Sequence, residues 1–167
     1  MQKKVLTEQA LYYGNVNMPK DWHIDSDKLS QDILQSSFTN RQFPFSKNWD
    51  RLNTYIRDYI RVEHDISLFN KNSWGDIYKP NQTSKLLLNV DLVDLINSPD
   101  FTILYGVKVD KCWVKINFDD NRRKGRSWDI ELKKNMFIMF PSTNTYVISN
   151  NQKESLNFIQ TITYEYI

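Results

Sequence analysis

The strongest constraint on the fold is a run of short β-type segments that fills the chain from residue 66 to residue 167. Phe101, Ile103 and Tyr105 alternate with other residues, and so do Cys112 and Val114; this is the period of a strand with one buried face. Turn-forming stretches such as "KPNQ", "NSPD" and "STN" separate the segments, which begin with "DISLF", "SWGDIY" and "SKLLLNVDLV". Eight or nine short strands with this punctuation predict a sandwich, jelly roll or barrel.

The N-terminal part of the chain has a helical pattern instead. In "NWDRLNTYIRDYIRVEH", Trp49, Leu52, Ile56 and Ile60 recur at spacings of three and four, which predicts an amphipathic helix lying on a core. A shorter helix is expected over "DKLSQDILQSSF", with Ser26 as its cap. We therefore predict a single domain over residues 1–167, with a helical segment at 1–65 and a roll at 66–167.

Composition and charge exclude several classes of protein. Cys112 is the single cysteine, so neither an internal disulfide nor a cysteine-based zinc site is available. The net charge of +2 does not call for a nucleic-acid partner. "MQKKVLTEQA" lacks the apolar run of a signal peptide, and the apolar runs are too short to span a bilayer. We expect a soluble protein in a reducing compartment, neither secreted nor membrane-bound.

Four segments, taken in order, resemble a known enzyme family. "NSWGDIYKPNQ", "DFTILYGVKV", "MFIMFPS" and "LNFIQTITY" look like successive strands of the prolyl-hydroxylase-like 2-oxoglutarate- and iron(II)-dependent oxygenases. The resemblance covers residues 66–167 and implies a mainly β (α+β) fold. This fold is a double-stranded β-helix, or jelly roll, with two N-terminal helices packed on it.

The resemblance also implies where iron and 2-oxoglutarate would be held, and those positions carry other residues here. The family's His-x-Asp or His-x-His pair would fall at about Ser84 and Leu86, and its distal histidine at Tyr146. Asn157 and Phe158 stand near the place of the Arg or Lys that pairs with 2-oxoglutarate. Because no histidine follows His64, we predict a roll without catalytic residues, metal or cofactor.

An active enzyme with a relocated iron site is the alternative. His23 and Asp25 form a His-x-Asp pattern in "WHIDSD", and His64 would supply a second imidazole. The competing interpretation is that Asp25 serves the start of one helix and His64 the end of the other. We favour this structural interpretation of the three residues.

The segment "FDDNRRKGRSW" is the most unusual local sequence. Its cations are Arg122, Arg123, Lys124 and Arg126, and Trp128 follows closely. We expect this hairpin to contact an acidic protein surface or solvent rather than nucleic acid, because a lone basic loop is a poor predictor of nucleic-acid binding.

These observations predict a non-catalytic binding or structural protein whose partners are other subunits of an assembly. Stretches such as "NTYIRDYI" and "NSPDFTILYGV" are similar in style to proteins of contractile-tailed phages of marine bacteria. That similarity implies a virion component of the neck, tail or baseplate, made in the host cytoplasm. A sugar-binding roll is the third class, but the periodic positions of the aromatic residues place them in the core instead.

Overall fold

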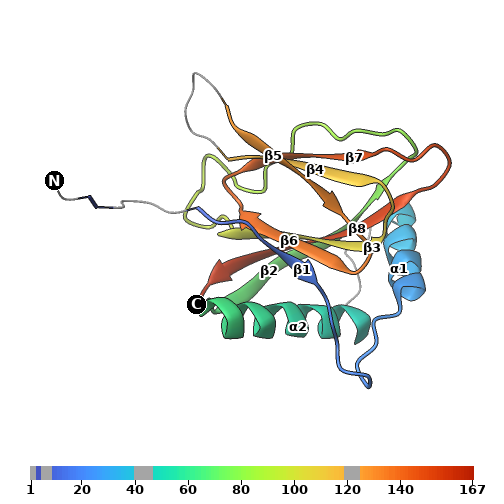
Figure 1. Cartoon of the computed structure of the whole chain (residues 1–167), viewed down its shortest axis with the longest axis horizontal. Helices are drawn as coiled ribbons and strands as arrows, with labels where there is room; N and C mark the ends of the chain where they lie inside the picture. The colour runs from blue at the N-terminus through green and yellow to red at the C-terminus, as the bar shows by residue number, and fades with distance from the viewer. Residues whose placement is uncertain (1–2, 5–8, 40–46, 119–124) are drawn as a thin grey trace.

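The computed structural model describes residues 3–4, 9–39, 47–118 and 125–167. Figure 1 shows two helices beside a two-layered arrangement of strands. Within the described residues the elements are β1 (Tyr12–Asn15), α1 (Ser26–Thr39), α2 (Lys47–His64), β2 (Leu68–Tyr78), β3 (Phe101–Lys108), β4 (Cys112–Asn117), β5 (Ser127–Leu132), β6 (Met136–Pro141), β7 (Thr145–Asn150) and β8 (Asn157–Tyr166).

The strands form two antiparallel sheets. The larger sheet has the order β1-β6-β3-β8-β2, and the smaller sheet has the order β5-β4-β7. In the larger sheet β2 pairs with β8 and β3 pairs with both β6 and β8. The mainly β roll with two N-terminal helices, predicted from the sequence, is confirmed.

Both predicted helices are present and lie against the larger sheet (Figure 1). The side chain of Asp25 caps α1, because its Oδ1 accepts hydrogen bonds from the backbone N–H groups of Asp27 and Lys28, each at 3.1 Å. The cap is thus one residue earlier than the predicted Ser26. A close approach fixes α1 on β2, since a Cβ atom on Gly75 would meet Ile33 Cγ1 at 2.4 Å.

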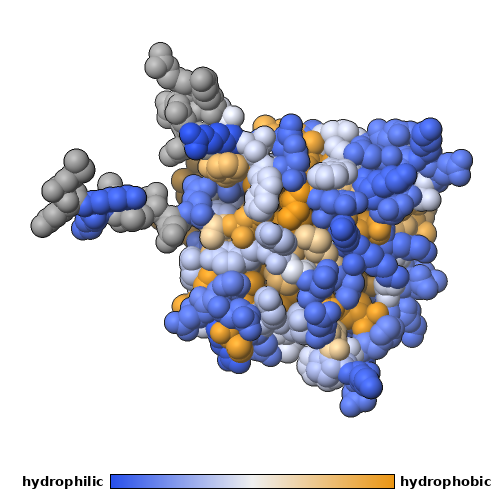
Figure 2. All heavy atoms as spheres, viewed as in Figure 1, coloured by the Kyte–Doolittle hydropathy of each residue, from blue (hydrophilic) through white to orange (hydrophobic). Residues whose placement is uncertain are grey.

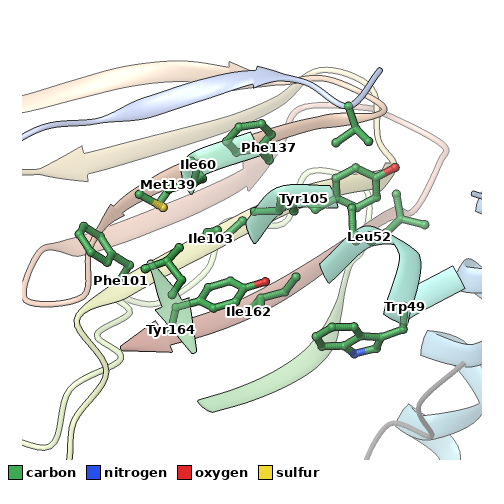
Figure 3. Close-up of a cluster of buried hydrophobic side chains, with 14 of the residues drawn as sticks. Trp49, Leu52, Ile60, Phe101, Ile103, Tyr105, Phe137, Met139, Ile162 and Tyr164 are labelled. Atoms are coloured by element: carbon green, nitrogen blue, oxygen red, sulfur yellow. The ribbon is translucent and has the colours of Figure 1, made fainter. Parts of the chain in front are cut away.

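Two apolar cores lie on opposite faces of the larger sheet. The helix-side core joins the helices to that sheet and includes Ile56, Ile103 and Tyr105 (Figure 3). The roll core lies between the two sheets and includes Leu104 and Tyr146. Because strand residues point alternately to the two faces, β3 contributes to both cores and is almost wholly buried.

Three details differ from the sequence-based prediction. Residues 1–65 are not purely helical, because β1 pairs with β6 at the edge of the larger sheet. "DISLF" and "SWGDIY" do not form two strands: one strand, β2, begins at Leu68 in the first and continues through the second, with an irregularity between Asn70 and Asn72. "SKLLLNVDLV" is not a strand either: within it Leu87 alone makes an isolated bridge to β7, and Thr83 makes another just before it.

No helix among the described residues has the length and apolarity needed to cross a membrane.

Candidate functional site

A half-buried carboxylate, Asp76, faces the inside of the roll. It shares this face of β2 with Trp74 and Tyr78, because alternate residues of a strand point the same way. Thr161 Oγ1 donates a hydrogen bond to Asp76 Oδ2 at 3.1 Å. Burial raises the pKa of Asp76, and the hydrogen bonds from Thr161 and Trp74 oppose this rise. Asp76 is the one carboxylate of β2 placed where it could bind or exchange a proton inside the roll.

Tyr146 occupies the position that the sequence comparison gave to a distal histidine. Only 2 % of Tyr146 is exposed, and its ring packs edge-on against Phe140 with centroids 5.1 Å apart. Burial raises the pKa of Tyr146 to about 12, against the effect of a hydrogen bond from Asn89. Burial also raises the pKa of Tyr78, and the nearby Asp76 raises it further. Both phenols are therefore neutral near pH 7.

The chain segment opposite Tyr146 contains Leu87 and Asn89. Leu87 and Tyr146 exchange backbone hydrogen bonds of 2.8 and 3.0 Å, so their side chains lie on the same face. Asn89 Nδ2 donates to the Tyr146 hydroxyl at 2.9 Å. The predicted residues lie elsewhere: Ser84 bonds the backbone of Ile148, and Leu86 is 60 % exposed. Ser84 and Leu86 therefore do not contact the Tyr146 hydroxyl through the hydrogen bonds that Asn89 makes.

A chain of polar side chains continues from Asn89 across the larger sheet. Asn89 Nδ2 also donates to Thr102 Oγ1 at 3.0 Å, and Thr102 shares a hydrogen bond of 2.8 Å with the Ser142 hydroxyl. Trp74, Asn89 and Lys71 line an open pocket of about 330 Å³ beside this chain. Lys71 is paired with Glu165 at 3.1 Å. The site therefore consists of hydrogen-bonded neutral groups around one carboxylate, with a paired cation at its mouth.

Asn157, the predicted replacement for a 2-oxoglutarate-binding cation, has a structural contact instead. It is fully buried, and its Oδ1 accepts hydrogen bonds from Asp110 N at 3.1 Å and from Gln152 Nε2 at 2.8 Å. Its Nδ2 donates to Asp110 O at 3.2 Å. The amide thus fixes the β3–β4 turn. Cys112 is buried nearby, and this burial raises the pKa of its thiol to about 12, which makes it a weak nucleophile.

The alternative triad is not brought together. Asp25 N donates to Asn48 Oδ1 at 3.2 Å, which places Asp25 at the start of α2. His64 is the last residue of α2 and packs on Tyr12 with ring centroids 4.5 Å apart. The two ends of this helix are about 24 Å apart at 1.5 Å per residue. His23 lies near the Asp25 end, where its carbonyl accepts a hydrogen bond from Arg51 at 3.0 Å.

The basic hairpin is described only in part. Arg122, Arg123 and Lys124 lie outside the described residues. Trp128 is 46 % exposed and makes an edge contact with Tyr13, with ring centroids 6.0 Å apart. Trp22, Trp74 and Trp128 line three different pockets rather than one concave face, so the aromatic platform of a sugar-binding roll is not formed by these three.

Known structures with the same fold are 2-oxoglutarate- and iron(II)-dependent oxygenases. A Pseudomonas putida prolyl-4-hydroxylase superimposes with a TM-score of 0.66 at 11% sequence identity, over 94% of this chain and 86% of that chain. The viral collagen prolyl hydroxylase vCPH from Paramecium Bursaria Chlorella virus-1 gives a TM-score of 0.63 at 12% identity, over 94% and 96%. SnoN from nogalamycin biosynthesis superimposes with a TM-score of 0.66 at 6% sequence identity, over 93% of this chain and 77% of that chain. No family model matches the sequence, and no curated protein sequence matches it.

The expectation of a cofactor-free roll is wrong by this comparison. The vCPH structure is a complex with 2OG, and SnoN is described as a non-heme alpha ketoglutarate dependent epimerase. The fold therefore implies iron and 2-oxoglutarate, although the identities establish only the fold.

The side chains of this roll do not fit the iron that the fold implies. An iron centre of this kind needs two imidazoles and one carboxylate on one face. Outside residues 1–2, 5–8, 40–46 and 119–124, no three His, Cys, Asp or Glu side chains come close enough to hold a metal ion. Leu87 and Asn89 meet Tyr146, the residue that the family resemblance places at the distal histidine. The chain thus has the double-stranded β-helix of the 2-oxoglutarate oxygenases, built around a different set of interior side chains.

Proposed function

We propose that this chain is an oxygenase-like roll that acts by binding protein partners and does not turn over a substrate. The observation that carries the proposal is the meeting of Leu87, Asn89 and Tyr146 inside the roll. None of these three side chains is ionised at pH 7: Leu87 and Asn89 do not titrate, and burial keeps the Tyr146 phenol neutral.

The hydrogen bonds of these side chains support a structural role. Asn89 bonds both Tyr146 and Thr102, and Thr102 bonds Ser142. A catalytic group needs a free lone pair or proton directed at the substrate. Here those atoms are used to hold β3, β7, the β6–β7 turn and the 87–89 segment together.

The proposed partners are other protein subunits of an assembly. Support comes from large apolar side chains that are more than half exposed, among them Phe38, Phe69, Val93 and Ile96. A place in a phage particle, as a neck, tail or baseplate component, is the specific form that the sequence style suggests.

The experiment that tests the proposal is an assay of 2-oxoglutarate turnover. The purified chain is incubated with iron(II), ascorbate and 2-oxoglutarate under air, and succinate is quantified with the Pseudomonas putida prolyl-4-hydroxylase as positive control. We expect succinate at the level of the protein-free control. Turnover that scales with protein concentration would overturn the proposal.

One double variant shows whether any measured succinate comes from a relocated active site or from a contaminating enzyme. His23→Ala combined with His64→Ala changes both imidazoles of the alternative triad. Any turnover should be the same in this variant as in the unmodified chain, because these side chains lie at opposite ends of α2. Turnover that this variant loses would make the alternative the better account.

A further inference from the structure

A groove lies between helix α2 and the loop that joins β1 to α1. It has a volume of about 430 Å³, and its α2 wall is formed by Tyr55, Asp58, Tyr59, Val62 and Glu63. These residues follow one another at helical spacings of three and four, so they share one stripe of the helix surface. We call this site the α2 groove.

The opposite wall of the α2 groove comes from the β1–α1 loop. Asn17, Pro19 and Trp22 line this side, and a turn fixes the loop, since Trp22 N donates to Pro19 O at 2.8 Å. Figure 1 shows the loop, in blue, running past α2. Trp22 is 41% exposed, so its indole is accessible to a partner.

The tyrosine rings of the groove are held in place by the fold itself. Tyr55 and Tyr59 stack with ring centroids 6.0 Å apart and an angle of 15° between the ring planes. Asn17 N donates to the Tyr55 hydroxyl at 3.0 Å, and Tyr59 packs edge-on against Phe137 with centroids 5.8 Å apart. Because these rings are already fixed, little entropy is lost when a ligand packs on them.

The charged side chains that line the α2 groove are both carboxylates. Asp58 and Glu63 line it, and no Lys, Arg or His among the described residues does; Lys20, next to Pro19, lines a neighbouring pocket. Arg61 lies 3.4 Å from Asp58, but the two side chains are 62% and 60% exposed, and a surface ion pair of this kind contributes little. Within the described part of the chain Glu63 has no ion-pair partner. The groove therefore combines negative charge with aromatic rings.

The surface around the α2 groove is mixed rather than purely apolar. Figure 2 shows hydrophilic and hydrophobic residues interspersed where the β1–α1 loop passes α2. Val62 adds an aliphatic side chain that is 74% exposed. A purely apolar partner would take the two carboxylates out of water without a counter-charge, so a partner with a cation beside apolar atoms is the better match.

We propose that the α2 groove binds an arginine side chain of a partner protein. The guanidinium packs against the Trp22 indole and pairs with the carboxylates of Asp58 and Glu63. This inference rests on the proposed function, because it names a surface through which the protein binds its partner and the chemistry that the partner supplies.

Arginine fits this groove better than lysine does. A guanidinium is planar, so it can stack on an aromatic ring and donate parallel hydrogen bonds to a carboxylate, whereas an ammonium group cannot do both. A cation within about 6 Å of an aromatic ring centroid is also attracted to the face of the ring. The groove volume of about 430 Å³ is within the range of sites that hold drug-sized molecules, so residues flanking the arginine have room to contact Pro19 and Val62.

The test is an NMR titration of the full chain with the blocked pentapeptide Ala-Leu-Arg-Leu-Ala. Binding should shift the indole N–H resonance of Trp22 and the backbone resonances of residues 55–63, with a Kd of about 1 mM or tighter. The same peptide with lysine in place of arginine should bind about fivefold more weakly, and with norleucine about tenfold or more.

Variants of the groove and a charge-matched control make the test specific. Asp58→Asn combined with Glu63→Gln should weaken peptide binding by about tenfold, and Trp22→Leu by about fivefold. Asp129→Asn combined with Glu154→Gln removes the same charge from exposed positions outside the groove and should change the affinity by less than about twofold. Circular dichroism checks that each variant is folded.

Several results would overturn the arginine site. These are no shift of the groove resonances at about 10 mM peptide, equal binding of the arginine peptide and either substituted peptide, and equal weakening by the control variant. Binding of N-acetylarginine amide as tight as that of the pentapeptide would also overturn it, because the groove would then be a small-molecule site. Each result would leave the proposal of a non-catalytic roll standing, whereas succinate formation would overturn that proposal without affecting peptide binding.

Discussion

The helix-side core and the roll core share the larger sheet but differ in chemistry. On β3, Ile103 and Tyr105 point to the helices, whereas Thr102 and Leu104 point into the roll. The helix-side core is packed mainly by aliphatic and aromatic side chains. The roll core places Asp76, Asn89 and Thr161 among its apolar residues. Both faces of the sheet are packed with apolar residues, and the roll face also buries polar side chains.

Changes in the helix-side core should have the largest effect on stability. Ile56 is fully buried between α2 and the sheet. Ile56→Ala should lower the free energy of unfolding by about 2–5 kcal/mol, because it leaves a cavity. Urea denaturation measures this loss, with the exposed Val62→Ala as control. A loss close to that of the control would show that the helices are not docked as described.

Gly75→Ala tests the contact between α1 and β2. The added Cβ would lie 2.4 Å from Ile33 Cγ1 and 2.7 Å from Ile33 Cγ2, so overpacking should cost about 1–3 kcal/mol. Ile33→Ala in the same chain makes room, and the double variant should be more stable than the sum of the two single losses predicts. Strict additivity in denaturation experiments would argue against the contact.

Removing one hydroxyl from each core gives a matched pair of smaller effects. Tyr146→Phe removes the acceptor of Asn89 in the roll core, and Tyr105→Phe removes the donor to Asn135 Oδ1 at 2.8 Å on the helix side. Each should cost about 0.5–1.5 kcal/mol in unfolding free energy. In double-mutant cycles, the losses of unfolding free energy caused by Tyr146→Phe and Asn89→Leu should not be additive, because the two side chains share a hydrogen bond. The losses caused by Tyr146→Phe and Tyr105→Phe should be additive. The reverse pattern would contradict the polar chain described for the roll.

The smallest expected effect is a pH dependence that originates from Asp76. Burial raises the pKa of this carboxyl in the folded state above its unfolded value of about 3.9. The stabilisation of the folded state by protonated Asp76 is then fully present below the unfolded-state pKa. It is lost as the pH rises through the folded-state pKa. The stability of Asp76→Asn relative to the unmodified chain should therefore increase from about pH 4 upward. A difference that stays constant or shrinks with pH would disprove this environment for Asp76.

The sequence predicted the parts of the fold that periodicity determines. Trp49, Leu52, Ile56 and Ile60 follow the helical period, and the helix they predict is the observed α2. The alternation of Cys112, Val114 and Ile116 likewise predicts β4. β1 was missed because four residues are too few to show a period.

The positions of side chains inside the roll were harder to predict from the sequence. Residues 84–93 looked like a strand because of their leucines, but Leu86 and Val93 point to solvent. Only isolated bridges hold residues 83–87 against β7, so sequence periodicity could not show that Leu87 and Asn89 face Tyr146. Asp76 could have been found from the alternation of Trp74, Asp76 and Tyr78, which places a carboxylate on a face shared with large aromatic residues.

The central claim is that Leu87, Asn89 and Tyr146 converge inside the roll, around the residue that the family resemblance places at the distal histidine. It is tested most directly by installing Leu87→His, Asn89→Asp and Tyr146→His together. Anaerobic titration calorimetry then compares iron(II) binding in the variant and in the unmodified chain, and circular dichroism checks that both are folded. We predict that the triple variant binds iron(II) at one site and at least about tenfold more tightly. A folded triple variant that binds iron(II) no better than the unmodified chain would contradict the convergence of these three positions.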